Sequence, residues 1–183
     1  MIDFGYNLEV LRGVLDDGAV AGIIVTLLAH TLSPSYWREL RDLAASAGVL
    51  LAVDEIKTGV RYGLGGMSRS VGVTPGITLL SKGLTNGMAL SALVDHTGVM
   101  SHAATTNLGG TYRTERTPFA VALATLELLE KEPGVFDHLT AMTDRFVEGM
   151  TAVLEEEQIG AAVFGRSGDL EFVCESPTLW DEL

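Results

Sequence analysis

An acidic pair and a lysine follow two short apolar runs in the middle of the chain. Asp54 and Glu55 come directly after residues 49–53, and Lys82 comes shortly after residues 77–80. Runs of this length are typical of buried strands in a parallel sheet, where the ligand crevice lies beyond the carboxyl ends of the strands. Side chains alternate along a strand, so Asp54 and Glu55 should point to opposite faces. The pattern therefore places one acid and one amine each just past a buried strand.

The preceding pattern predicts the elements that would hold these groups. Residues 20–28, 34–47 and 49–53 read as strand, helix and strand, which by default form a right-handed crossover unit. The sequence predicts an α/β fold with a mostly parallel sheet. Further elements are expected as a helix at 8–15, strands at 77–80 and 91–94, and a helical turn at 97–104.

The last third of the chain has a different pattern. Pro118 begins a helix to about residue 131, and a long amphipathic helix covers residues 135–156. Two strands of a second sheet are expected at 161–164 and 170–174. The turn Glu132-Pro133-Gly134 between the helices predicts a boundary, with one domain over residues 1–132 and a second over 133–183.

Two motifs at a fixed distance resemble a known enzyme family. The sequence DEIKTGVR begins at Asp54, and SKGLTNG places Lys82 twenty-eight positions later. Together they resemble the class III pyridoxal phosphate (PLP)-dependent aminotransferases, and within that family most of all the glutamate-1-semialdehyde 2,1-aminomutase-like branch. The resemblance implies the three-layer α/β large domain of PLP-dependent aminotransferases, followed by the start of a small α+β C-terminal domain. It also implies amino-group transfer through a lysine aldimine, between a small-molecule amino donor and a carbonyl acceptor.

The same resemblance assigns roles to individual residues. Asp54 would keep a proton on the pyridine nitrogen of PLP, and Ile56 would lie against the face of the ring. Lys82 would form the Schiff base and later carry a proton between the substrate and the cofactor. Thr111, in GTYRTERTPFA, would contact the cofactor phosphate of the other subunit of a homodimer, with Thr114 as the alternative residue.

Each motif also has a structural explanation. A carboxylate pair after a strand is often a helix cap or a surface pair, and a lysine before a glycine is often only solvated. We expect Glu55 to form a structural ion pair with Arg61 or Lys57. The glycine-rich residues 63–68 match no phosphate-binding motif and are interpreted as flexible. Thr117 before Pro118 fits a helix N-cap.

Composition limits the other possibilities. A net charge of −12 argues against nucleic acid or an anionic membrane surface as a partner. No apolar run approaches the ~18 residues of a membrane span, and the N-terminus lacks a signal-peptide pattern, so a cytoplasmic location is expected. The single cysteine, Cys174, and the spacing of the four histidines predict no metal site.

The length of the chain bears on its activity. Members of the family have more than twice the 183 residues present here. No glycine- and serine-rich cup for the cofactor phosphate precedes Asp54, and a Glu-Pro pair common in the family is replaced near Thr26 and Leu27. We therefore expect a truncated chain that binds PLP weakly when alone. The alternative is a non-catalytic remnant that keeps the core of the fold and associates with a full-length partner.

Overall fold

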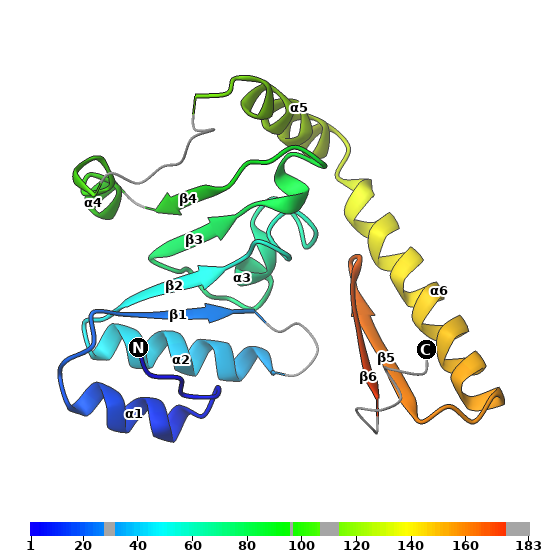
Figure 1. Cartoon of the computed structure of the whole chain (residues 1–183), viewed down its shortest axis with the longest axis horizontal. Helices are drawn as coiled ribbons and strands as arrows, with labels where there is room; N and C mark the ends of the chain where they lie inside the picture. The colour runs from blue at the N-terminus through cyan, green and yellow to red at the C-terminus, as the bar shows by residue number, and fades with distance from the viewer. Residues whose placement is uncertain (28–31, 96, 107–113, 175–183) are drawn as a thin grey trace.

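A computed structural model describes residues 1–27, 32–95, 97–106 and 114–174 (Figure 1). The elements are α1 (Leu8–Asp16), β1 (Gly22–Thr26), α2 (Pro34–Ser46), β2 (Leu50–Asp54), α3 (Gly66–Ser70), β3 (Ile77–Leu80), the 3₁₀ turn η1 (Lys82–Leu84), β4 (Ala92–Asp95), α4 (Thr97–Met100), the 3₁₀ turn η2 (Ala103–Thr105), α5 (Thr117–Lys131), α6 (Gly134–Glu156), β5 (Ala161–Arg166) and β6 (Asp169–Cys174).

The larger sheet has the strand order β1-β2-β3-β4. The first three strands are parallel, and β4 runs antiparallel to β3, as the arrowheads in Figure 1 show. The predicted α/β class is therefore confirmed. Strand β3 has the predicted bounds, whereas β1 begins two residues later than predicted because its pairing with β2 starts at Gly22 and Leu50.

One face of this sheet is covered by α1 and α2. Trp37 and Leu40 on α2 are each 1% exposed and belong to a core cluster with Ile23, Val25 and Val53. The opposite face is more open, because Ile24 on β1 is 59% exposed. Strands β1 and β2 thus have one face buried under helices and one face available for other contacts, whereas no residue of β3 or β4 is buried.

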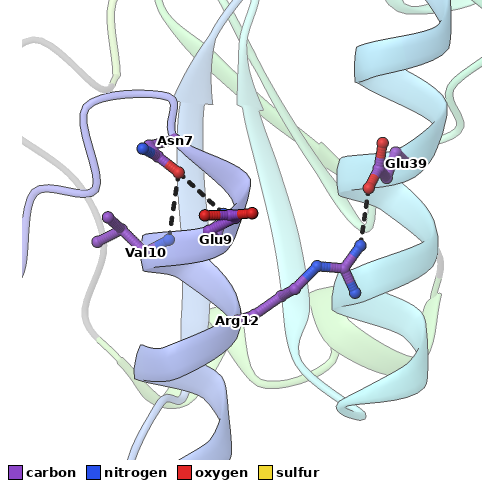
Figure 2. A network of polar contacts seen from close by, with 5 residues as sticks. All are labelled: Asn7, Glu9, Val10, Arg12 and Glu39. Atoms are coloured by element: carbon purple, nitrogen blue, oxygen red, sulfur yellow. Dashed lines mark hydrogen bonds and ion pairs between the residues drawn. The ribbon is translucent and has the colours of Figure 1, made fainter.

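A side-chain cap begins α1, and an ion pair links α1 to α2. The side chain of Asn7 accepts hydrogen bonds from the backbone N–H groups of Glu9 and Val10 at the start of α1 (Figure 2). Arg12 on α1 pairs with Glu39 on α2 at 2.7 Å. Both of these side chains are about half exposed, so the ion pair contributes at most about 1 kcal/mol.

The C-terminal part packs as a hairpin against a long helix. Strands β5 and β6 pair in antiparallel fashion and lie along α6 (Figure 1). Their connecting turn, Ser167-Gly168, has positive φ at both residues. It is held by α6, because Gly168 N donates to Thr143 Oγ1 at 2.7 Å and the Thr140 and Ser167 hydroxyls lie 2.9 Å apart.

Among the helices that the structure describes, none combines the length and the apolar character that crossing a membrane requires.

Candidate functional site

Asp54 is the last residue of β2 and lies on the more open face of the sheet. The register places Asp54 beside Thr26 of β1 on one side and Leu79 of β3 on the other. Its Oδ1 accepts a hydrogen bond of 2.8 Å from the backbone N–H of Ile56. This bond orients the half-buried carboxylate at the carboxyl edge of the sheet, where an acceptor oxygen can face a ligand.

Lys82 begins the turn η1, two residues after β3 ends. It has φ of 43°, a left-handed conformation that side chains other than glycine seldom adopt. Its carbonyl accepts from the N–H groups of Thr85 at 3.3 Å and Asn86 at 3.2 Å, which fixes this conformation. The side chain of Lys82 is exposed.

Two glycines allow the turn after β2 to pack closely on the end of β3. A Cβ atom on Gly59 would collide with the side chain of Leu80, and one on Gly83 would lie 2.6 Å from Val60 Cγ2. Only residues without a side chain fit this approach. The segments that follow Asp54 and that carry Lys82 are therefore in direct contact.

Glu55 points to the other face and is 1% exposed. Its carboxylate accepts hydrogen bonds from Thr58 Oγ1 (2.8 Å), Met67 N (2.8 Å), Ser68 N (2.7 Å) and Ser68 Oγ. The prediction of an ion pair with Arg61 or Lys57 is wrong. Four hydrogen-bond donors take the place of a cation, three of them at the start of α3 and the fourth from Thr58, since a buried charge needs compensation.

Among residues 63–68, which the sequence analysis interpreted as flexible, Gly66 has a packing role. Gly66 is buried with φ of 65°, and a Cβ atom there would lie 2.6 Å from both carboxylate oxygens of Glu55. The glycines thus make room for a buried carboxylate. Sequence reasoning missed this contact, and the adjacent glycines 65 and 66, where a backbone can approach closely, were the one signal that could have indicated it.

Lys57 and Arg61 instead contact the C-terminal hairpin. The ammonium of Lys57 pairs with Asp169, whose side chain is 5% exposed, and Arg61 donates to the carbonyl of Gly168. Burial, with a smaller contribution from Asp169, raises the pKa of the nearby Tyr62 above its usual range. These contacts join the segment after Asp54 to the tip of the hairpin.

The remaining predicted residues are placed as follows. Ile56 is half-buried directly after Asp54 and Glu55. Thr111 lies outside the described residues, and Thr114 is exposed. Thr117 is the first residue of α5, and Arg116 occupies the N-cap position without a side-chain cap, so the N-cap prediction for Thr117 is wrong. Thr26, at the point of departure from the family, accepts a hydrogen bond on its carbonyl from Tyr6 Oη at 2.9 Å. Within the described ranges, no cluster of His, Cys, Asp or Glu has the arrangement of a metal site.

Comparisons with known proteins agree on the family. Residues 16–172 match the family model described as aminotransferase class-III. The chain is 33% identical over 178 residues to 2'-deamino-2'-hydroxyneamine transaminase of Streptomyces kanamyceticus. The aligned region covers 93% of this chain and 44% of that relative. The chain thus spans less than half the length of this curated relative.

Solved structures share the fold. The ornithine delta-aminotransferase of Plasmodium falciparum superposes with a TM-score of 0.79 at 24% sequence identity. The superposition covers 98% of this chain and 48% of the aminotransferase chain. FumI of Sphingopyxis sp. MTA144, described in its PLP internal aldimine form, gives a TM-score of 0.80 at 20% identity, over 95% of this chain and 44% of its own.

Proposed function

Because this chain belongs to the class III aminotransferases, we propose that it carries the lysine and the ring-binding carboxylate of a PLP-dependent aminotransferase site. Pyridoxal phosphate is the cofactor of this family, as the sequence predicted. The observation that carries the proposal is the contact between the turns after β2 and β3, which holds Asp54 and Lys82 at one edge of the sheet. The left-handed backbone of Lys82 supports it further, since strain of this kind recurs at functional sites.

The residues present fit the cofactor. Asp54 offers a carboxylate whose Oδ1 is already oriented by Ile56 N, and the described part of the chain supplies no other hydrogen bond to it. A carboxylate in this state can accept the N–H of a protonated pyridine ring. Lys82 offers an exposed amine on the adjoining turn, which suits reaction with an aldehyde.

The proposed mechanism divides the work among three side chains. When bound, the cofactor supplies an aldehyde and an electron-accepting ring. Asp54 keeps the ring nitrogen protonated through a charge-assisted hydrogen bond, which favours electron withdrawal. Ile56, half-buried beside Asp54, would lie against one face of the ring and keep water from it. Lys82 would hold the cofactor through its side-chain amine, and the same amine would move a proton at the α-carbon of the amino substrate.

The finer parts of the proposal concern substrates and assembly. We take a small-molecule amine as donor and a carbonyl compound as acceptor, with transfer between two molecules, because the relative at 33% identity is named a transaminase. The narrower likeness to the aminomutase branch has no such support. A homodimer in which Thr111 serves the partner's cofactor rests on the resemblance alone.

Chemical labelling tests the proposal directly. The purified chain is incubated with PLP, reduced with borohydride and digested, and the pyridoxyl label is located by mass spectrometry. The chain has three lysines, Lys57, Lys82 and Lys131, which peptide mapping distinguishes from one another. We expect the label on Lys82 and its loss in Lys82→Arg, with Lys131→Arg as the matched control. A label on Lys57 or Lys131 in place of Lys82 would contradict the assignment.

A further inference from the structure

Glu55 is a fully buried carboxylate to which the proposed mechanism gives no role. It is 1% exposed, and among the described residues no lysine or arginine pairs with it. Taking an unpaired charge out of water is costly, and a glutamine or an apolar side chain would avoid that cost. The position of the carboxylate therefore needs a reason beyond filling space.

The hydrogen bonds of Glu55 connect two segments that lie far apart along the chain. Its side chain accepts from Met67 N and Ser68 N, twelve and thirteen residues further on, while its own N–H donates to Leu79 O at 3.0 Å. Gly59 N donates to Glu55 O at 2.7 Å. Both the backbone and the side chain of Glu55 are consequently fixed, the backbone by β3 and the next turn, and the side chain by α3.

This fixation acts on the neighbours of Glu55. Asp54, the last residue of β2, precedes it, and Ile56, the first residue of the following turn, comes after it. The N–H of Ile56, which orients Asp54 Oδ1, belongs to the peptide formed by the carbonyl of Glu55. Any rotation of Glu55 about its backbone would displace the donor that aims the Asp54 carboxylate.

We propose that Glu55 is a positioning residue, which holds the N-terminal amides of α3 and thereby fixes the direction of Asp54 and Ile56 toward the cofactor ring. The inference rests on the proposed function, because it assumes that Asp54 binds the ring. A carboxylate suits this role better than an amide, since it accepts from all four donors whereas glutamine would set its NH₂ group against one of them.

The test separates local loosening from a general loss of stability. Glu55→Gln is compared with the wild-type chain and with Leu154→Ala, a substitution of a buried residue on α6, which packs against β5. Amide hydrogen exchange is measured for Ile56 and for Val53, which lies in the ladders of β2 with both neighbouring strands. We expect Ile56 to exchange roughly tenfold faster relative to Val53 in Glu55→Gln, because weakened bonds to a charged group change a local opening equilibrium by about that factor.

The ratio also distinguishes positioning from simple stabilisation. A purely structural carboxylate would accelerate both amides together, as we expect for Leu154→Ala, and an unchanged ratio in Glu55→Gln would overturn the inference. If Glu55→Gln does not fold, Ser68→Ala decides, because it removes one donor and leaves the carboxylate. We expect a smaller shift of the Ile56 to Val53 ratio in Ser68→Ala, and no shift would overturn the inference.

A second measurement tests the link to the cofactor. Pyridoxamine 5'-phosphate serves as the probe because it lacks the aldehyde that reacts with Lys82. We expect both Asp54→Asn and Glu55→Gln to weaken its binding, and Leu154→Ala to leave it unchanged at a temperature where the chain is folded. If Asp54→Asn binds the probe as the wild type does, the proposed function fails. The ratio of the Ile56 and Val53 exchange rates then still tests whether Glu55 orients its neighbours. If only Glu55→Gln binds normally, the positioning role is overturned.

Discussion

Replacing Gly66 by alanine would place a methyl group against the carboxylate of Glu55. The new Cβ atom would lie 2.6 Å from Oε1 and from Oε2, closer than nonbonded carbon and oxygen atoms approach. A glutamate side chain is normally free to move aside. Here it could do so only by leaving the amides of Met67 and Ser68 and the hydroxyl of Thr58.

The expected cost has two parts. Alanine at φ of 65° costs about 1–2 kcal/mol in the backbone, of which part is offset by the lower entropy of the unfolded chain. Displacing the carboxylate weakens hydrogen bonds to a charged group, which contribute ~1.5–3 kcal/mol each. We therefore expect Gly66→Ala to lower the free energy of unfolding by roughly 3–4 kcal/mol, a large fraction of the ~5–15 kcal/mol of a typical domain.

Gly72→Ala is the matched control. Gly72 follows α3 and also has a positive φ, of 74°. A Cβ atom added there would meet only Arg38 Cδ, at an ordinary 3.9 Å. It should lose only the backbone part, about 1 kcal/mol net. Urea denaturation of the two variants and the wild type gives the difference. Equal destabilisation by both substitutions would refute the reasoning, because it would show that the carboxylate moves without loss.

Other predictions concern the hairpin contact and alkaline stability. Lys57→Met should destabilise the chain by about 1–2 kcal/mol, because it leaves the buried Asp169 unpaired while Lys57 itself is half exposed. Lys131→Met, which breaks only an exposed pair at 3.8 Å, should change the melting temperature little, and equal effects in the two variants would contradict this view. Burial, with Tyr6 and Glu39, raises the pKa of Tyr36 from 10.0 to about 12, so the folded state holds this proton more tightly than the unfolded state. Stability should fall as the pH rises from 10.0 to about 12, and Tyr36→Phe should make that fall less steep in thermal melts. An unchanged slope in Tyr36→Phe would count against this explanation.

The sheet and the places of Asp54 and Lys82 could be predicted because they depend on local signals. Apolar runs of strand length specify β2 and β3, and the default connection of parallel strands puts their ends at one edge. Helix α2 likewise follows from helical periodicity, since Trp37, Leu40 and Ala44 recur at helical spacing and are buried.

The partners of Glu55 and Lys57 could not be predicted in the same way. Opposite charges nearby in sequence suggested a pair between them, but Lys57 binds Asp169, 112 positions further on (169 − 57). The helix that receives Glu55 has only five residues, too few for a periodic pattern. Contacts made by backbone amides carry little trace in residue type, so only the glycines at 65 and 66 indicated them.

The contacts of Lys57 and Arg61 with the hairpin have a mechanical consequence. The loop after Asp54 is held at one end by the sheet and by α3, and further along by the tip of β5–β6. A loop that is fixed at both ends cannot absorb a displacement of the hairpin by changing its own conformation. The backbone of Glu55 would therefore shift together with the hairpin. A movement of β5 and β6 would therefore change the position of Asp54 before it changed the centre of the sheet.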